Sequence, residues 1–142
     1  MSKNPIPQGK YKPAVRHGNM VFTAGMTPRK DGVLLMAGKI SPAEPLDTYR
    51  DAIRQAAANA LTAAQNCLEE GEKIVQVLTL YVYVNATDDF TTHAKVGDVV
   101  SEYLYEQLGD AGIGPRAASF MNKALYARAL ELGVQFLLET PG

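Results

Sequence analysis

Residues 47–85 read DTYRDAIRQAAANALTAAQNCLEEGEKIVQVLTLYVYVN, and this stretch decides the fold. Its first part places apolar residues, mostly alanine, at helical spacing, and Gly71 ends that pattern. We therefore predict a helix over residues 47–70. Small side chains along one face suit close packing on a sheet. Cys67 lies beside this alanine stripe and is expected to be a small core residue.

The second part of the stretch changes to β-branched and aromatic residues. Both side-chain parities are largely apolar over residues 73–85. Such a run is typical of a central strand that is covered on both faces. One parity holds Val75, Val77, Thr79, Tyr81 and Tyr83, and the other holds Leu78, Leu80, Val82 and Val84.

The flanking segments complete an α+β pattern. Residues 15–25 predict a hairpin around His17-Gly18-Asn19, and residues 33–36 predict a short strand after the Lys30-Asp31-Gly32 turn. Residues 41–46 hold two prolines and predict a loop, and a second helix is expected over residues 90–108. Final strands follow at 117–121 and 128–138. The result is a sandwich with a mixed sheet of five to six strands and two helices on one face.

Length and composition indicate one domain over residues 1–142. The chain is 46% hydrophobic with a formal net charge of -1, which offers no electrostatic basis for binding nucleic acid or an anionic membrane. Residues 1–10 are polar and are expected to be loosely ordered. No apolar run approaches a membrane span or the core of a signal peptide. A single cysteine suggests a reducing compartment, so we expect a cytoplasmic protein.

Arg116 and Glu131 are the candidate functional residues. Arg116 follows the glycine-rich stretch 109–115, and Glu131 stands in an apolar run where a carboxylate is costly unless it is used or paired. A guanidinium for a substrate carboxylate and a carboxylate for water chemistry would together make a small hydrolytic site. The alternative interpretation is a surface arginine and a glutamate at a strand edge.

Other chemistry has little support in the sequence. His17 and His93 are the two histidines, and each is expected to be solvated or locally bonded. No Cys/His/carboxylate spacing predicts a metal site, and no cofactor motif is present. The glycines near residue 112 lack the Lys-Ser/Thr and the helix start of a phosphate-binding loop.

Two segments resemble the RidA/YjgF family of enamine and imine deaminases, which includes proteins named endoribonuclease L-PSP. The first is residues 9–28, GKYKPAVRHGNMVFTAGMTP, and the second is Pro115-Arg116 with Glu131 at the family's spacing. The resemblance covers about residues 9–139 in order. It implies a chorismate-mutase-like fold assembled as a homotrimer, with a cleft at each subunit interface.

The resemblance also implies a reaction and its residues. Imino and enamino acids such as 2-aminoacrylate would be hydrolysed to 2-keto acids and ammonia, without metal or cofactor. Arg116 would bind the substrate carboxylate through a forked contact, and Glu131 would activate water. Tyr11 would close the cleft from a loop. Ala24 and Gly25 would bring the backbone close to the substrate, and Ala118 would line the same pocket.

Several positions depart from the family pattern. Lys12 and Ala24 replace usual serines, Ala118 replaces a frequent cysteine, and Gly133 replaces the second glutamate of a Glu-x-Glu ending. Residues 124–126 replace a Leu-Pro element, and Gly97 lies nearest to an expected asparagine. These changes leave an alternative function open, a non-catalytic trimer that binds a small carboxylate or has a stress-related role. No basic stripe with interleaved aromatics predicts RNA binding.

Overall fold

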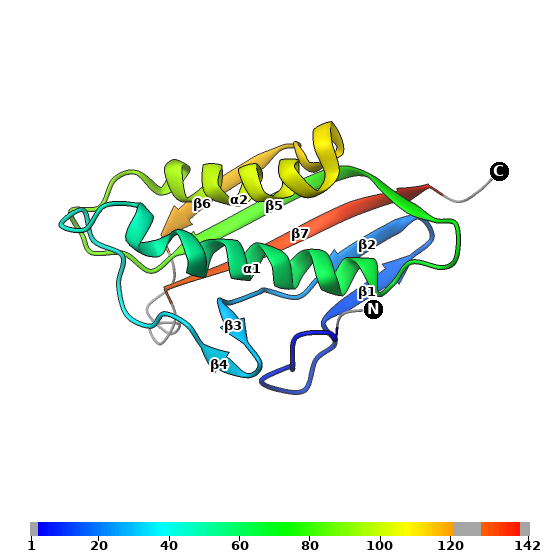
Figure 1. Cartoon of the computed structure of the whole chain (residues 1–142), viewed down its shortest axis with the longest axis horizontal. Coiled ribbons are helices and arrows are strands. Elements are labelled where there is room, and N and C mark those ends of the chain that lie inside the picture. Colours follow the sequence, from blue (N-terminus) through cyan, green and yellow to red (C-terminus); the bar gives the residue numbers. More distant parts are fainter. Residues whose placement is uncertain (1–2, 121–128, 140–142) are drawn as a thin grey trace.

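A computed structural model describes residues 3–120 and 129–139 (Figure 1). Within these residues the chain forms strands, a helix, a long strand, a second helix and two more strands. The elements are β1 (Ala14–His17), β2 (Met20–Thr23), β3 (Arg29–Lys30), β4 (Val33–Leu34), α1 (Asp47–Gln65), β5 (Lys73–Val84), α2 (His93–Leu108), η1 (Gly109–Gly112), β6 (Arg116–Phe120) and β7 (Leu130–Glu139).

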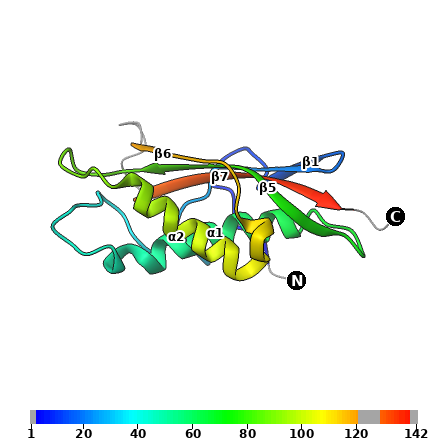
Figure 2. The same cartoon turned by 90° about the horizontal axis from the view of Figure 1, so that it is seen from above.

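The main sheet has five strands in the order β1-β2-β7-β5-β6. β5 and β6 are parallel, and the other neighbours are antiparallel. Both helices lie on the same side of this sheet (Figure 2). The α+β sandwich with a mixed sheet and helices on one face is thereby confirmed. β3 and β4 form a separate two-stranded sheet, and the strand character of β3 was not predicted.

Alternation along β7 creates the core. Leu130, Leu132, Val134, Phe136 and Leu138 are all buried toward the helices. The intervening residues of β7 face the other side of the sheet. The helix side of the core is made mostly of alanine on α1 and valine on α2, which allows both helices to approach the sheet closely.

The sheet face opposite the helices is open within one chain. Tyr81 and Tyr83 of β5 are 47% and 42% exposed, so β5 is covered on one face and not on both. The predicted parity of β5 is also wrong at its start, because Val77 is buried on the same side as Leu80. Register shifts between Ile74 and Gln76 and between Val77 and Thr79 cause this change.

Both helices are shorter than the periodicity predicts. α1 ends at Gln65, where the chain enters a tight turn in which the Cys67 N–H donates to the Ala64 carbonyl. The Cys67 carbonyl accepts a bond from Arg16. Gly71, with a φ of 82°, lies in the following turn. α2 begins at His93 and not at residue 90. The preceding residues form a turn in which the Phe90 N–H donates to the Thr87 carbonyl.

Two tight turns match the sequence signals. Gly18, between β1 and β2, has a φ of 59°. Asp31 and Gly32, between β3 and β4, have φ values of 53° and 81°. Two consecutive residues with positive φ are the requirement of a type I′ hairpin turn. The strand expected over 33–36 is confined to Val33–Leu34.

Arg16 ties the first hairpin to the turn after α1. Its guanidinium forms a forked salt bridge with Glu72, which includes a 2.7 Å bond from Nη2 to Oε2. It also donates to the carbonyls of Gly18 and Cys67. The Glu72 side chain is 3% exposed. The Arg16 hydrogen bond and the backbone N–H of Glu69 lower the pKa of Glu72 to about 2.

This pair predicts a pH-dependent stability. A carboxylate with a lowered folded-state pKa stabilises the fold above its ordinary pKa of 4.5, and that contribution is lost as the pH falls toward 2. We expect Glu72→Gln to unfold at lower temperature than the wild type at pH 7, with a gap that narrows below pH 4.5. Thermal unfolding at several pH values measures it. Glu70→Gln, on the same turn, is the control, and a gap independent of pH would contradict the assignment.

Candidate functional site

Arg116 begins β6 and lies against α2. It pairs with Leu80 of β5, so its side chain is on the helix side of the sheet. The guanidinium donates from Nη1 to Ser101 Oγ at 3.0 Å and from Nη2 to Asp98 Oδ1 at 2.8 Å. Gly97 makes room for it, because a Cβ there would lie 3.0 Å from the Arg116 Nε. These contacts hold the Arg116 guanidinium in place, and the side chain is one-quarter exposed.

A hollow of about 410 Å³ adjoins this arginine. Both of its side-chain partners on α2 line the hollow, so a small molecule there would meet the groups that hold Arg116. The lining residues are Asp98, Ser101, Glu102, Tyr105, Glu106 and Ile113.

Glu131 lies on β7 opposite Tyr83 of β5, on the open face of the sheet. Its carboxylate covers Gly25: a Cβ built on Gly25 would lie 2.7 Å from the Glu131 Cδ. The two segments are held together by reciprocal backbone bonds between Met26 and Leu132, at 2.6 and 2.9 Å. Gly25 therefore lets a carboxylate lie directly on the main chain.

Arg116 and Glu131 do not meet within one chain. Register places Arg116 with Leu80 and Glu131 with Tyr83, and these two β5 residues point to opposite faces of the sheet. The carboxylate that contacts Arg116 within this chain is Asp98 and not the expected Glu131, and Asp98 was not predicted from the sequence. The available signal was the spacing of Asp98 and Ser101, which places them one turn apart on a helix.

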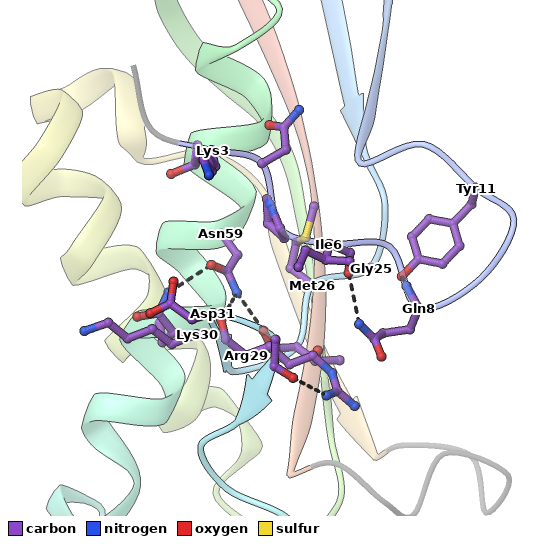
Figure 3. A pocket seen from close by; sticks show the side chains of 16 residues that line it. Lys3, Ile6, Gln8, Tyr11, Gly25, Met26, Arg29, Lys30, Asp31 and Asn59 are labelled. Carbon is purple, nitrogen blue, oxygen red and sulfur yellow. Dashed lines mark hydrogen bonds between the residues drawn. The ribbon is translucent and has the colours of Figure 1, made fainter.

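Tyr11 and Gly25 both line a cavity of about 470 Å³ beside α1 (Figure 3). Tyr11 is half exposed, and its hydroxyl accepts a hydrogen bond from the Gln8 N–H at 3.0 Å. The rest of the lining comes from residues 3–8, from Met26 and Thr27, from the β3–β4 hairpin and from one face of α1. The N-terminal residues expected to be loosely ordered thus form one wall of this cavity.

Asn59 of α1 is a buried polar residue of this region that the sequence analysis missed. Its Nδ2 donates to the carbonyls of Thr27 and Arg29, at 3.0 and 2.8 Å, and its Oδ1 accepts from Gln55 (Figure 3). These bonds fix the segment after Gly25 against the helix. A polar residue within an alanine-rich stripe was the available signal.

Ala24 directly precedes Gly25, and Ala118 lies on β6. Ala24 is half-buried, and its N–H donates to the Pro13 carbonyl at 2.8 Å. Ala118 pairs with Val82 and therefore shares the face of Arg116, where it packs on the core. The residues expected to form one pocket are thus divided in a single chain: Arg116 and Ala118 on one face, Glu131 and Gly25 on the other.

The part of the chain that the structure describes contains neither a metal-binding cluster nor a membrane-spanning helix. Over 3–120 and 129–139, no group of three histidine, cysteine, aspartate or glutamate side chains is placed to hold a metal ion. Nor does this part of the chain contain a helix long and apolar enough to span a bilayer. His93 packs edge-on against Phe90 with 5.1 Å between ring centroids, in agreement with a local structural role. Burial raises the pKa of the Cys67 thiol.

Comparison with known proteins identifies the family. The family model described as Endoribonuclease L-PSP matches residues 1–108. A RutC family protein from Pyrococcus abyssi is 30% identical over 105 residues, which are 73% of this chain and 71% of the relative. The match to the family model ends before Arg116 and Glu131, so it supports the family independently of the two candidate residues.

Solved structures confirm the fold. A protein from Shewanella oneidensis MR-1 is 25% identical with a TM-score of 0.80, covering 96% of this chain and 90% of that one. TdcF of Escherichia coli, solved with bound serine, is 21% identical with a TM-score of 0.62, covering 94% and 92%. The chain belongs to the endoribonuclease L-PSP family, the family of the YjgF and RutC proteins.

Proposed function

We propose that this protein hydrolyses reactive imines and their enamine tautomers to carbonyl compounds and ammonia. The observation that carries the proposal is the position of the Glu131 carboxylate, which lies over the backbone of Gly25 on the sheet face opposite the helices. A carboxylate beside a backbone segment without a side chain can receive a proton from a water molecule next to a small substrate. Family membership and the serine bound to TdcF, a small amino acid, support a small-molecule substrate.

The chemistry requires few groups. Water adds to the carbon of the C=N bond while Glu131 takes one of its protons. The same proton then passes to the nitrogen, which gives a carbinolamine. Glu131 next takes the proton of the carbinolamine hydroxyl and passes it to the nitrogen, so that the C–N bond breaks and ammonia leaves as the carbonyl forms. An enamine such as 2-aminoacrylate enters this sequence after it tautomerises to the imine. A substrate carboxylate would be held by the Arg116 guanidinium through two parallel N–H donors.

The proposed site combines two copies of the chain. Because Arg116 and Glu131 lie on opposite faces of one sheet, a single chain does not present both to one substrate. Tyr81 and Tyr83 leave aromatic surface on the open face, which a second chain would cover. We therefore place the reaction in an interface cleft, with Glu131 and Gly25 from one subunit and Arg116 from its neighbour.

The experiment that tests this function is ammonia release. Imino acids are generated in situ by an amino-acid oxidase, and ammonia is measured with and without this protein. We expect faster release with the protein, at a rate proportional to its concentration. Equal rates would refute the catalytic proposal.

We also propose that the protein acts in a reducing compartment such as the cytoplasm, as its single cysteine suggests.

A second candidate is a trimer that binds a small carboxylate without turning it over. The observation in its favour is that, within one chain, Arg116 lies on the sheet face opposite Glu131, so among the described residues the guanidinium has no general base beside it on that sheet face except its partner Asp98. Such a protein would bind a 2-keto acid and leave the rate of imine hydrolysis unchanged. The ammonia assay and a binding measurement on the same sample separate the two candidates.

Assembly is the first consequence of the proposal. We expect a homotrimer of about 46 kDa, three times the 15.3 kDa chain, with each interface burying well over ~1,000 Å². The physical reason is the apolar sheet face that the helices do not cover. Light scattering coupled to size-exclusion chromatography measures the mass. A stable monomer at micromolar concentration would contradict both the trimer and a site shared between chains.

The carboxylate role of Arg116 predicts the effect of lysine. Arg116→Lys keeps the positive charge but loses the second parallel donor. Binding of 2-oxobutanoate, a stable 2-keto acid of the kind that the reaction would produce, should therefore weaken by ~1.5 kcal/mol, roughly tenfold. Titration calorimetry measures the affinity. Arg29→Lys, on the β3–β4 hairpin, is the control for loss of a guanidinium elsewhere. Equal affinity in wild type and Arg116→Lys would exclude the forked contact.

A further inference from the structure

The donors that Arg116 would offer to a substrate carboxylate are already engaged. Nη1 donates to Ser101 and Nη2 donates to Asp98, and these two nitrogens form one of the two donor pairs of a guanidinium fork. The Nε side faces the backbone of Gly97. A carboxylate that approaches the fork must therefore displace Asp98 or lie beside it.

Asp98 can compete with a substrate carboxylate for the Arg116 guanidinium without blocking the access of a ligand to the hollow. Its side chain is 58% exposed and lines the 410 Å³ hollow together with Ser101. An exposed ion pair of this kind is weak, so a ligand can separate it at small cost. The negative charge nevertheless stays near the fork after separation and repels an incoming carboxylate. A neutral imine meets no such repulsion, and its N–H can donate to Asp98.

We infer that Asp98 is a specificity-determining residue that weakens the hold of Arg116 on carboxylate ligands and admits imines that carry no carboxylate. The inference rests on the proposed function, because it concerns the substrate of the same Arg116 site. It extends that function from 2-imino acids to a second substrate class, uncharged imines of the form R–CH=NH. These hydrolyse to an aldehyde and ammonia by the same addition of water.

A binding experiment tests the inference without relying on turnover. The dissociation constant of 2-oxobutanoate is measured by calorimetry for the wild type, Asp98→Asn and Asp98→Ala. We expect both variants to bind about two- to fivefold more tightly, the effect of removing one exposed charge beside the fork. The difference should shrink at roughly 1 M salt, where exposed charges are screened. Alanine favours helix and asparagine keeps the side-chain shape, so the two variants check each other for altered folding.

Glu139→Gln is the matched control. Glu139 is also 58% exposed and paired, with Lys73 at 3.2 Å, so its replacement changes the net charge equally at a site on β7. Its affinity for 2-oxobutanoate should equal that of the wild type. If neither Asp98 variant binds 2-oxobutanoate more tightly than the wild type, or if Glu139→Gln gains as much, the inference is overturned.

Turnover provides a second readout. Ammonia release is compared for imino acids from an amino-acid oxidase and for carboxylate-free imines from an amine oxidase acting on a primary amine. We expect the wild type to accelerate both, and the Asp98 variants to shift the ratio about two- to fivefold toward the imino acid. An unchanged ratio would overturn the inference. Failure of the wild type on both substrates would instead refute the proposed function, while the binding comparison would still decide the role of Asp98.

Discussion

Glu131→Gln should lower imine hydrolysis by roughly 10²–10⁴-fold, the usual contribution of a positioned general base. Glutamine keeps the shape of the side chain and its contact with the Gly25 backbone, but it cannot take a proton from water. Binding of 2-oxobutanoate should change little, because the proposed carboxylate contact is made by Arg116. Ammonia release from imino acids measures the first effect, and calorimetry measures the second.

Ammonia release, melting temperature and trimer mass, measured on one preparation, distinguish a catalytic role of Glu131 from a structural one. If Glu131 instead serves the structure, the glutamine variant should lose thermal stability or trimer mass while the remaining trimer keeps its activity. Glu139→Gln, at the far end of the same strand, controls for the loss of a carboxylate on β7. Unchanged turnover in a well-folded Glu131→Gln trimer would remove Glu131 from the mechanism and favour the carboxylate-binding alternative.

The fold could be predicted from the sequence because its signals are local and periodic. Alanine at helical spacing predicted that α1 packs on the sheet. The Gly18 turn marked the first hairpin, and the Asp31-Gly32 turn marked the start of β4 but not the strand β3 before it. The predicted end of α1 and the predicted side-chain parity of β5 were wrong, because a turn and an irregular strand register determine them. The helical run ends at Gln65 in a tight turn whose Cys67 carbonyl is bonded by Arg16, and register shifts in β5 move Val77 to the buried side. Neither effect is visible in residue spacing alone.

The candidate site was less predictable than the fold. A sequence gives the separation of Arg116 and Glu131 along the chain but not the sheet face that each occupies. Strand order decides this, since β5 lies between β6 and β7 and each residue takes the face of its β5 partner. Asp98 was not predicted, because in the sequence an exposed carboxylate on a helix cannot be told from other solvated residues. Only the structure shows that Arg116 lies beside it.

The second large effect is expected at Gly25, where a single methyl group should disable the site. A Cβ on Gly25 would lie 2.7 Å from the Glu131 Cδ and 2.9 Å from its Cγ, well inside van der Waals contact. The Gly25 φ is not in the left-handed region, so alanine is compatible with the local backbone. The flexible carboxylate must therefore move while the main chain stays, and the fold should be retained.

Displacing a catalytic group by about 1 Å can cost roughly 10²-fold in rate, so Gly25→Ala should lower imine hydrolysis by about that factor or more. Gly133→Ala is the matched control, because Gly133 lies two residues from Glu131 on the same strand face and a Cβ there meets nothing within 4 Å. Ammonia release, melting temperature and trimer mass are compared for both variants. Full activity in a folded Gly25→Ala trimer would show that the position of the carboxylate over the Gly25 backbone is irrelevant to the reaction. Equal losses in the two variants would assign the effect to the sheet surface and not to Glu131.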